Sequence, residues 1–182
     1  CTVTDDNGCT ATESVTITQN ALVVASGTVT NVLCRNASTG SIDFGVVGGS
    51  SSYQYSWAVS NGGALGGNAA NAQDLTSLVA GTYTCTVTES NGCTVTGTVA
   101  FAVTQPAAAL SASSTQTNVN CNGGSDGTAT AVPTGGTSPY TYLWNDASGQ
   151  TTVTATGLSA ASYSCTVTDV NGCNVSTTIT VT

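Results

Sequence analysis

The sequence predicts an all-β protein: tandem immunoglobulin-like β-sandwich repeats without helices. Three observations predict this fold class. A long motif recurs at the spacing of a small domain, apolar residues alternate with a period of two, and Gly-rich turns separate short segments. Apolar residues do not follow the 3.6-residue period of an amphipathic helix. We expect the repeats to follow one another as an extended, semi-rigid rod.

The recurring motif reads Cys-Thr-Val-Thr, an acidic residue, one variable residue, and then Asn-Gly-Cys. It occupies residues 1–9, 85–93 and 165–173. Successive copies start 84 and then 80 residues apart, which is the length of one small β-domain. The motif therefore marks one position in each unit of a tandem array.

Self-alignment of the chain defines the limits of these units. Cys34 falls on Cys121, and seven extra residues within 60–73 of the first full unit account for the change in offset from 87 to 80. We interpret this Asn/Gly/Ala-rich insertion as a loop, because loops tolerate added length and core strands do not. The predicted domains are the C-terminal hairpin of a truncated repeat at 1–19, a first full repeat at 20–105 and a second at 106–182.

Short alternating segments in the second full repeat predict its strands. Tyr140, Tyr142 and Trp144 share one strand face, which we interpret as core rather than as a sugar-stacking platform. A Trp on a central strand is typical of an immunoglobulin-like sandwich. We predict seven strands: Leu110–Ser114, Asn118–Cys121, Thr128–Val132, Tyr140–Trp144, Thr151–Thr156, Tyr163–Thr168 and Val175–Val181.

The last two of these strands form a predicted hairpin around the segment 169–173. An Asn-Gly pair after a variable residue is typical of a type I turn closed by a left-handed Gly. This three-residue loop sets the register, so that Val167 pairs with Val175 and Tyr163 pairs with Ile179 on the inner face.

The units meet at short connections. Residues 18–21 and 104–107 are too few to behave as flexible coils, and Pro106 stiffens the second connection. This is the basis for expecting a semi-rigid rod.

The charge balance excludes some partners. The chain has one Arg, no Lys and no His against nine acidic residues, for a net charge of −8. Binding to a nucleic-acid backbone or to an anionic membrane surface needs several basic side chains. We therefore expect no nucleic-acid partner and no direct membrane insertion, and we find no apolar run long enough to span a bilayer.

The eight cysteines indicate an oxidising compartment. They include no Cys-x-x-Cys pair and are accompanied by no His, so disulfides are favoured over zinc or redox chemistry. No signal peptide is visible, and we expect the segment to be an internal piece of a longer secreted protein.

Candidate catalytic and metal sites are weak. Without His or Lys no triad with a histidine base can be assembled, so we predict that the chain is not an enzyme and needs no cofactor. Asp5, Asp6 and Asp126 offer oxygens for calcium, but Thr39 replaces Asp126 in the other unit. We interpret these as turn-forming residues and predict no metal site.

Several motifs together resemble one known family. They are Cys-Asn-Gly-Gly-Ser-Asp-Gly at 121–127, the segment 135–144 that ends in Tyr-Thr-Tyr-Leu-Trp, Gly-Leu-Ser-Ala at 157–160, and the Cys motif at 163–173. In this order they resemble the SprB-type repeat of giant surface adhesins of gliding Bacteroidota. They also resemble, more distantly, the PKD module, which implies a PKD-like, immunoglobulin-like β-sandwich. The resemblance implies an extracellular, surface-attached repeat, exported by the type IX secretion system, and it implies no identified binding site.

Disulfide connectivity stays open at this stage. In an immunoglobulin-like topology Cys121 lies at the end of the unit opposite the final hairpin turn, and Cys165 is nearer to it than Cys173. We favour Cys34–Cys85 and Cys121–Cys165, which would leave Cys93 and Cys173 free to crosslink adjacent units. The rival pairing is Cys34–Cys93 and Cys121–Cys173, which would leave Cys85 and Cys165 as buried thiols.

Three functions fit these observations. The first is a non-catalytic stalk segment of a secreted cell-surface adhesin, with adjacent repeats of the same chain as partners and an unknown surface or glycan ligand. The second is a subunit of a self-assembling extracellular filament, in which copies pair through exposed strand edges. The third is a carbohydrate-binding module that uses Trp57, Tyr55 or the loop 60–73.

Overall fold

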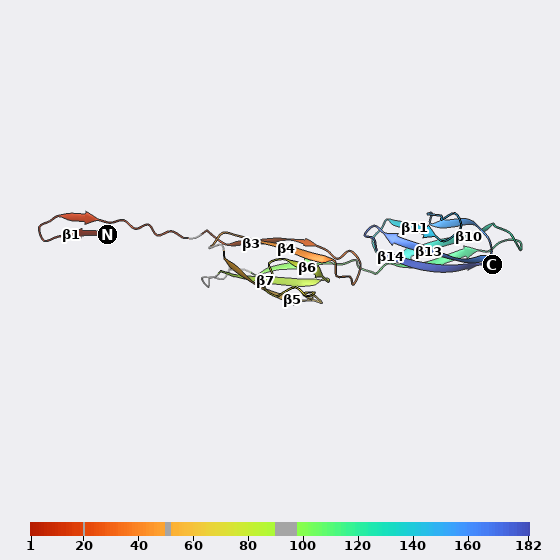
Figure 1. Cartoon of the computed structure of the whole chain (residues 1–182), viewed down its shortest axis with the longest axis horizontal. Helices are drawn as coiled ribbons and strands as arrows, with labels where there is room; N and C mark the ends of the chain where they lie inside the picture. Colours follow the sequence, from red (N-terminus) through yellow and green to blue (C-terminus); the bar gives the residue numbers. More distant parts are fainter. Residues whose placement is uncertain (20, 50–51, 90–97) are drawn as a thin grey trace.

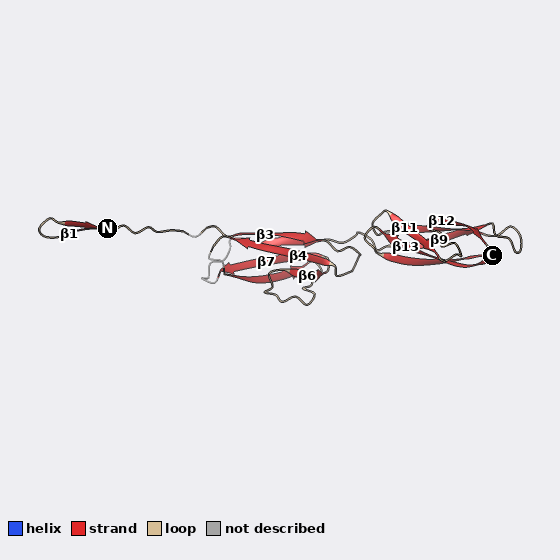
Figure 2. Cartoon of the chain, turned by 45° about the horizontal axis from the view of Figure 1, so that its top comes forward, coloured by secondary structure: helices blue, strands red, loops and turns tan. Residues whose placement is uncertain are grey.

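The computed structural model of the chain describes residues 1–19, 21–49, 52–89 and 98–182, and these residues contain strands and no helix. Figure 1 shows a hairpin near the N-terminus and two groups of strands that follow one another along the long axis. Figure 2 shows the same succession in red after rotation, with loops at the ends of each group.

The N-terminal hairpin consists of β1 (Thr2–Thr4) and β2 (Thr10–Thr12). The next six strands, which we call the first sandwich, are β3 (Val24–Thr30), β4 (Gly40–Val47), β5 (Tyr53–Ser60), β6 (Leu75–Leu78), β7 (Gly81–Glu89) and β8 (Val99–Val103). The last six, the second sandwich, are β9 (Ser111–Thr117), β10 (Gly127–Thr134), β11 (Tyr140–Trp144), β12 (Thr154–Leu158), β13 (Ala161–Asp169) and β14 (Asn174–Val181).

Both sandwiches have the same topology. Each contains two three-stranded antiparallel sheets, with orders β3-β4-β6 and β5-β7-β8 in the first and β9-β10-β12 and β11-β13-β14 in the second. In immunoglobulin terms these are an A-B-E sheet and a C-F-G sheet. The all-β, immunoglobulin-like fold predicted from the sequence is therefore confirmed.

Alternation of side chains builds the core of each sandwich. On β13, Cys165, Val167 and Asp169 are buried, and the residues between them are more exposed. Trp57 and Trp144 lie in the two cores with 6% and 1% of their surface exposed. Each indole Nε1 donates to a carbonyl, that of Ala72 at 2.8 Å or of Thr152 at 3.0 Å. The interpretation of these aromatic faces as core is confirmed.

The predicted C-terminal hairpin is confirmed in detail. Tyr163 pairs with Ile179 and Val167 with Val175. The turn is closed by the N–H of Gly172, which donates to the carbonyl of Asp169 at 3.0 Å. Gly172 has φ of 83°, in the left-handed region where glycine has no steric cost.

One predicted strand is wrong. The segment 118–121 is a loop, so the second sandwich, all of whose residues the structure describes, has six strands rather than seven. The strand was predicted because Val119 is an apolar residue between polar ones. In the structure the N–H of Val119 donates to the carbonyl of Thr182 at 3.1 Å, at the end of the sandwich. The segment therefore ties the chain that follows β9 to the end of β14 and adds no strand to either sheet.

Apolar side chains of the N-terminal segment are solvent-exposed. Val3, Val15 and Ile17 have 64%, 82% and 93% of their surface exposed. The register of the hairpin, with Thr2 opposite Thr12, places Val15 and Ile17 where Ile179 and Val181 lie in the second sandwich. Their counterparts pack into a core, because there a second sheet covers them.

Candidate functional site

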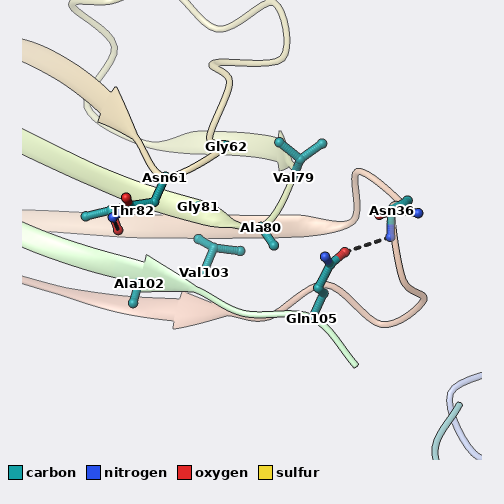
Figure 3. A pocket seen from close by; sticks show the side chains of 10 residues that line it. All are labelled: Asn36, Asn61, Gly62, Val79, Ala80, Gly81, Thr82, Ala102, Val103 and Gln105. Carbon is teal, nitrogen blue, oxygen red and sulfur yellow. Dashed lines mark hydrogen bonds between the residues drawn. The ribbon is translucent and has the colours of Figure 1, made fainter. Parts of the chain in front are cut away.

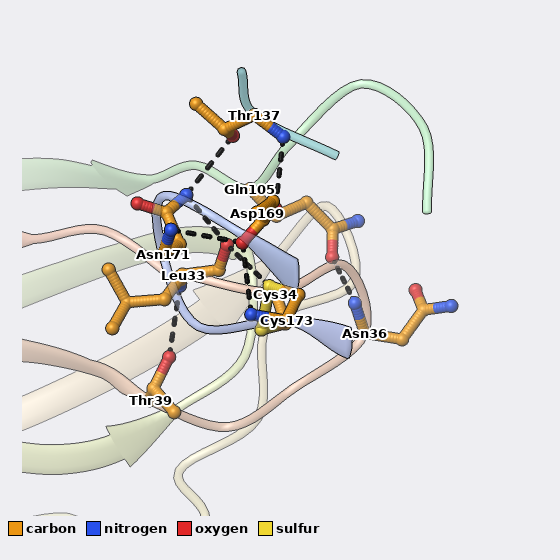
Figure 4. Close-up of a disulfide and its surroundings, with 9 residues drawn as sticks. All are labelled: Leu33, Cys34, Asn36, Thr39, Gln105, Thr137, Asp169, Asn171 and Cys173. Carbon is orange, nitrogen blue, oxygen red and sulfur yellow. Dashed lines mark hydrogen bonds between the residues drawn. A yellow bond between two sulfur atoms is a disulfide. The ribbon is translucent and has the colours of Figure 1, made fainter. Parts of the chain in front are cut away.

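The feature that stands out in the structure is a disulfide that joins the two sandwiches. Cys34, in the loop between β3 and β4, is bonded to Cys173, which follows the turn between β13 and β14. Their Cα atoms are 5.7 Å apart, and 139 positions of sequence separate them (Figure 4). The crosslink therefore connects one unit with the next.

The predicted pairings within a unit do not occur in the structure. Cys34 is bonded to neither Cys85 nor its rival Cys93, which lies outside the described residues, and Cys121 is bonded to neither Cys165 nor Cys173. The physical reason is the position of the two buried cysteines along their strands. Cys85 and Cys165 are in the middle of β7 and β13, fully buried and opposite Trp57 and Trp144, and so are far from the end loops.

Both earlier alternatives contained part of this arrangement. The favoured one left Cys173 at the end of its unit, where it can crosslink to a neighbour, as the structure has it. The rival one left Cys85 and Cys165 as buried thiols, which they are. Burial raises the pKa of the Cys85 thiol to about 11, and it raises the pKa of Cys165 as well, so both stay protonated and unreactive near neutral pH.

A buried carboxylate shapes the turn that carries Cys173. Oδ1 of Asp169 accepts hydrogen bonds from the N–H groups of Asn171 and Cys173, both at 2.9 Å. Its Oδ2 accepts another from the N–H of Thr137 at 2.9 Å. Asp169 is only 5% exposed. Three N–H donors thus hold the carboxylate, and two of them belong to the turn that it stabilises.

Asn171 extends from this turn to the first sandwich. Its Nδ2 donates to the carbonyl of Leu33 at 3.2 Å and to Oγ1 of Thr137 at 3.0 Å. Leu33 is adjacent to Cys34, so the amide and the disulfide contact the same loop (Figure 4). In the third copy of the recurring motif the acid forms the turn, Asn171 binds the preceding unit and Cys173 bonds to it.

The connection between the units is held to the same loop. The guanidinium of Arg35 donates to the carbonyls of Pro106 and Ala107, at 3.2 and 2.6 Å. The N–H of Asn36 donates to Oε1 of Gln105 at 2.7 Å. The lone basic side chain of the sequence is therefore used to bind the linker backbone.

A small cavity of about 170 Å³ lies at this joint. Residues from both sides line it, including Cys34 and Arg35 from the first sandwich and Gly136 and Cys173 from the second. Cys34 and Cys173 are each partly buried. The two units thus contact one another through side chains, backbone and a covalent bond.

A larger hollow than the one at the joint lies beside β7 and β8 and measures about 640 Å³ (Figure 3). Neither an aromatic nor an ionisable side chain lines it. Two of its polar side chains are already engaged: Asn61 donates to Oγ1 of Thr82 at 3.0 Å, and Gln105 accepts from Asn36. It therefore lacks the aromatic face on which a sugar ring stacks.

The described part of the chain contains neither a cluster of metal-ligating side chains nor a membrane-spanning helix. No group of three or more His, Cys, Asp or Glu side chains there is arranged to hold an ion. Asp126 instead accepts from the backbone N–H of Asn120 at 3.1 Å, and this bond together with that of the Asn120 amide lowers its pKa. The same residues include no helix long and apolar enough to cross a membrane.

Comparison with known proteins identifies the repeat. The family model of the SprB repeat matches residues 26–63 and 113–149. The chain therefore contains SprB-type repeats, one in each sandwich. This is a repeat of the cell-surface adhesin type, and such repeats, like immunoglobulin-like domains, are typically structural rather than catalytic.

Two further searches complete the comparison. No curated protein matches the chain. Among solved structures, an amphioxus IgVJ-C2 molecule is similar to it at 14% identity and a TM-score of 0.32, over 91% of this chain and 98% of that one.

Sequence reasoning placed Gln105 in the connection between the units, but it missed Arg35 and Asn171 as residues of the joint. A signal for Asn171 was present, since the Asn of the motif recurs in all three copies although a turn also accepts other residues at this position. Arg35 had no such signal, because Asn122 takes its place in the second sandwich.

Proposed function

We propose that this chain is a structural stalk segment of a large secreted adhesin on a cell surface, where it serves surface attachment or gliding. It performs no catalysis, and its partners are adjacent repeats of the same long chain. Export by the type IX system fits this location. The observation that carries the proposal is the disulfide between SprB-type sandwiches, which makes the joint covalent twice, through the backbone and through Cys34–Cys173.

This crosslink changes how tension passes along the chain. When the two ends are pulled apart, the covalent path runs from residue 1 to Cys34, across the sulfur atoms, and from Cys173 to residue 182. Residues 35–172, which are 138 of the 182, lie outside that path. A stalk built in this way keeps its length even when a sandwich within the bypassed segment unfolds.

Single-molecule extension of the chain by its two ends tests the proposal. With the disulfide intact, the 44 residues 1–34 and 173–182 can extend to about 150 Å, at roughly 3.3–3.6 Å per residue. After reduction all 182 residues can extend, to about 600–650 Å. Cys34→Ser should behave as the reduced chain does, without added reductant.

The control is Cys1→Ser, which alters an exposed free thiol and should leave the short extension unchanged. Full-length extension of the oxidised native chain would remove the support for a tension-bearing stalk. It would show that Cys34 and Cys173 are not bonded to one another in the oxidised chain.

The N-terminal segment favours a second candidate, the filament subunit. Val15 and Ile17 are 82% and 93% exposed, and their counterparts Ile179 and Val181 are covered by a second sheet. Another copy could cover them by adding strands, which is a known mode of assembly. Electron microscopy of the purified protein distinguishes the two: single thin particles support the stalk, and ordered multi-chain fibres support the filament.

The carbohydrate-binding module lost its main support. Trp57 and Trp144 are buried and their indole N–H groups are bonded, so neither offers a free face to a sugar. The loop 60–73 packs Leu65 and Ala72 against the first core. Shielding of both Trp residues from an aqueous quencher such as acrylamide is the matching measurement.

A further inference from the structure

The loop that contains Cys121 repeats the geometry of the loop that contains Cys34. The N–H of Ala37 donates to the carbonyl of Cys34 at 3.0 Å, and the N–H of Gly124 donates to that of Cys121 at 2.9 Å. Asn36 has φ of 64° and its counterpart Gly123 has φ of 80°. The two loops therefore have the same local fold, although their sequences differ.

Both loops are also fixed to the rest of their sandwich in the same way. Val32 donates to the carbonyl of Thr104 at 2.9 Å, and Val119 donates to that of Thr182 at 3.1 Å. In return, Thr104 donates to Oδ1 of Asn31 at 2.9 Å, and Thr182 donates to Oδ1 of Asn118 at 3.0 Å. Thr182 thus stands where Thr104 stands, at the position from which the linker leaves.

The two loops differ in what binds them. Cys34 is partly buried and bonded to Cys173, whereas Cys121 is exposed and has a free thiol. The turn of the second sandwich occupies the first loop through Asn171 and Cys173. Nothing within the described residues occupies the second loop in the same way.

The turn that would fit is present twice in the described part of the chain. Oδ1 of Asp5 accepts from the N–H groups of Asn7 at 3.0 Å and Cys9 at 2.8 Å, as Asp169 does for Asn171 and Cys173. The turn before Cys9 therefore forms without a neighbouring sandwich around it. The acidic turn is preorganised by its own carboxylate, and it needs only a loop of the Cys34 type to bind.

We propose that Cys121 is the acceptor site for the next SprB-type repeat: it forms a disulfide with the Cys of that repeat's Asp/Glu-x-Asn-Gly-Cys turn. The crosslink Cys34–Cys173 is then one member of a series in which each unit is bonded to the next. Successive crosslinks overlap, because Cys121 precedes Cys173 in the chain. A series of this kind stays one covalent object after a single peptide bond in a linker is cut.

The bond forms by thiol–disulfide exchange. The Cys121 thiol loses its proton and attacks an oxidised small-molecule disulfide such as oxidised glutathione, which releases one reduced thiol. The turn cysteine then loses its proton, attacks the mixed disulfide and releases a second reduced thiol. Two protein thiols and one small disulfide give one protein disulfide and two small thiols, so protons and electrons balance.

An extended chain tests the proposal directly. A copy of residues 105–182 is placed after Thr182, because Thr182 holds the position of Thr104. In the added copy Val170→Ile, at a position 58% exposed, marks the turn peptide by its mass. The protein is oxidised with a glutathione buffer, free thiols are alkylated, and disulfide-linked peptides are mapped without reduction.

We expect Cys121 to be linked to the marked cysteine and the native Cys34–Cys173 link to form beside it. Because the two groups are in one chain, their effective concentration is in the millimolar range, and the extent of pairing should not change with protein dilution. Asn171→Ala in the added copy removes the side chain that binds the loop and should slow the pairing. The matched control has Val170→Ala in the added copy in place of the isoleucine; it also marks the turn peptide by mass and should leave the rate unchanged.

Two outcomes separate this proposal from the proposed function. Alkylated Cys121 in a sample where Cys34–Cys173 has formed would overturn the series of crosslinks and leave the stalk intact. Free thiols at both Cys34 and Cys173 would contradict the joint itself, and with it the observation on which the stalk rests. Pairing of Cys121 that is equally fast after unfolding in urea would also overturn the proposal, since docking would then have no part.

Discussion

The two sandwiches share one topology but have different cores. In the first, Ile42, Phe44 and Leu75 are fully buried, and Phe44 meets the rings of Tyr55, Trp57 and Phe101 edge to face at centroid distances of 5.9, 5.4 and 5.8 Å. In the second, alanines occupy the three equivalent positions: Ala129, Ala131 and Ala155. Strand order is the same in both. The register differs in one hairpin, since Cys85 pairs with Val99, 14 positions on, and its counterpart Cys165 pairs with Thr177, 12 positions on. Alternation and turn chemistry therefore specify this fold, and the identity of the core side chains is secondary.

The loops over the two cores differ in the same sense. Tyr83 is fully buried, and its hydroxyl lies 3.2 Å from the N–H of Ala64, a residue of the long loop. Its counterpart Tyr163 is partly exposed and bonds the carbonyl of Ser159 at 3.0 Å. The extra residues of the first unit thus cover Tyr83. They belong to the packing of the first sandwich, and nothing in their contacts indicates a separate binding function.

Phe44→Ala should have the largest effect on the stability of the first sandwich. It introduces the residue that the second sandwich has at Ala131, while Ile42 and Leu75 stay in place of Ala129 and Ala155. We expect a loss of about 3–5 kcal/mol in the free energy of unfolding, which is typical of Phe→Ala in a core. Pulse alkylation in urea measures it, since Cys85 and Cys165 are buried reporters of the first and second sandwich.

The same experiment contains its own control. The urea midpoint for labelling Cys165 should stay where it is in the native chain. A loss below about 1 kcal/mol at Cys85 would mean that the first sandwich adapts to alanine as readily as the second. An equal loss at both cysteines would mean that the sandwiches unfold together.

The sequence predicted those parts of the fold that depend on neighbouring residues. The turn at Asp169–Cys173 and the face formed by Tyr140, Tyr142 and Trp144 are local patterns, and both are confirmed. The strand predicted at 118–121 failed because local alternation there is interrupted by bonds to Thr182, more than 60 positions away. Such bonds leave no trace in a short window of sequence.

The joint was harder to predict because it depends on the ends of two units at once. The cysteine count and the repeat indicated disulfides, and sequence reasoning placed Cys121 correctly at the end opposite the hairpin turn. The predicted partners of Cys34 and Cys121 were in the same unit. A loop at one end of a sandwich, however, lies nearest to the opposite end of the following sandwich. Cys34 and Cys173 meet for that reason.

Alkaline pH should destabilise the first sandwich, because its buried Cys85 thiol resists ionisation. Burial raises the pKa of Cys85 from 9.0 to about 11. Below pH 9 the thiol is protonated in both the folded and the unfolded chain. Between pH 9 and 11 the unfolded chain loses this proton and the folded chain keeps it, so stability falls as pH rises, by about 2–3 kcal/mol in total at about 1.4 kcal/mol per unit.

Urea unfolding from pH 8 to 11, followed by Trp57 fluorescence in a Trp144→Phe background, measures this loss. Exposed thiols such as Cys9 and Cys121 are alkylated first, so that disulfides do not exchange. Cys85→Ala is the matched control and should flatten the profile. A profile with the same slope in Cys85→Ala would assign the alkaline loss to other groups, among them Tyr55, whose pKa burial also raises.

The smallest effect is expected at Arg35, which distinguishes the occupied loop from the free one, where Asn122 stands. Arg35→Gln removes the bonds to the carbonyls of Pro106 and Ala107 and should cost about 1 kcal/mol or less, since the side chain is exposed. Its clearer result is a change in the joint. With the disulfide reduced, small-angle scattering should show a wider spread of particle lengths for Arg35→Gln than for the native chain.

Trypsin gives an independent measure of the same contact, because the chain has no other Lys or Arg. While its guanidinium is bound to the linker, Arg35 should be cut far more slowly in the folded chain than in urea. Once it is cut, residues 1–35 and 36–182 should stay joined through Cys34–Cys173 and separate only on reduction. Rapid cutting of the folded chain would show that the linker does not hold Arg35. Release of the two pieces without a reductant would show that Cys34 is unbonded. The loop of Cys34 would then have a free thiol, as the loop of Cys121 does.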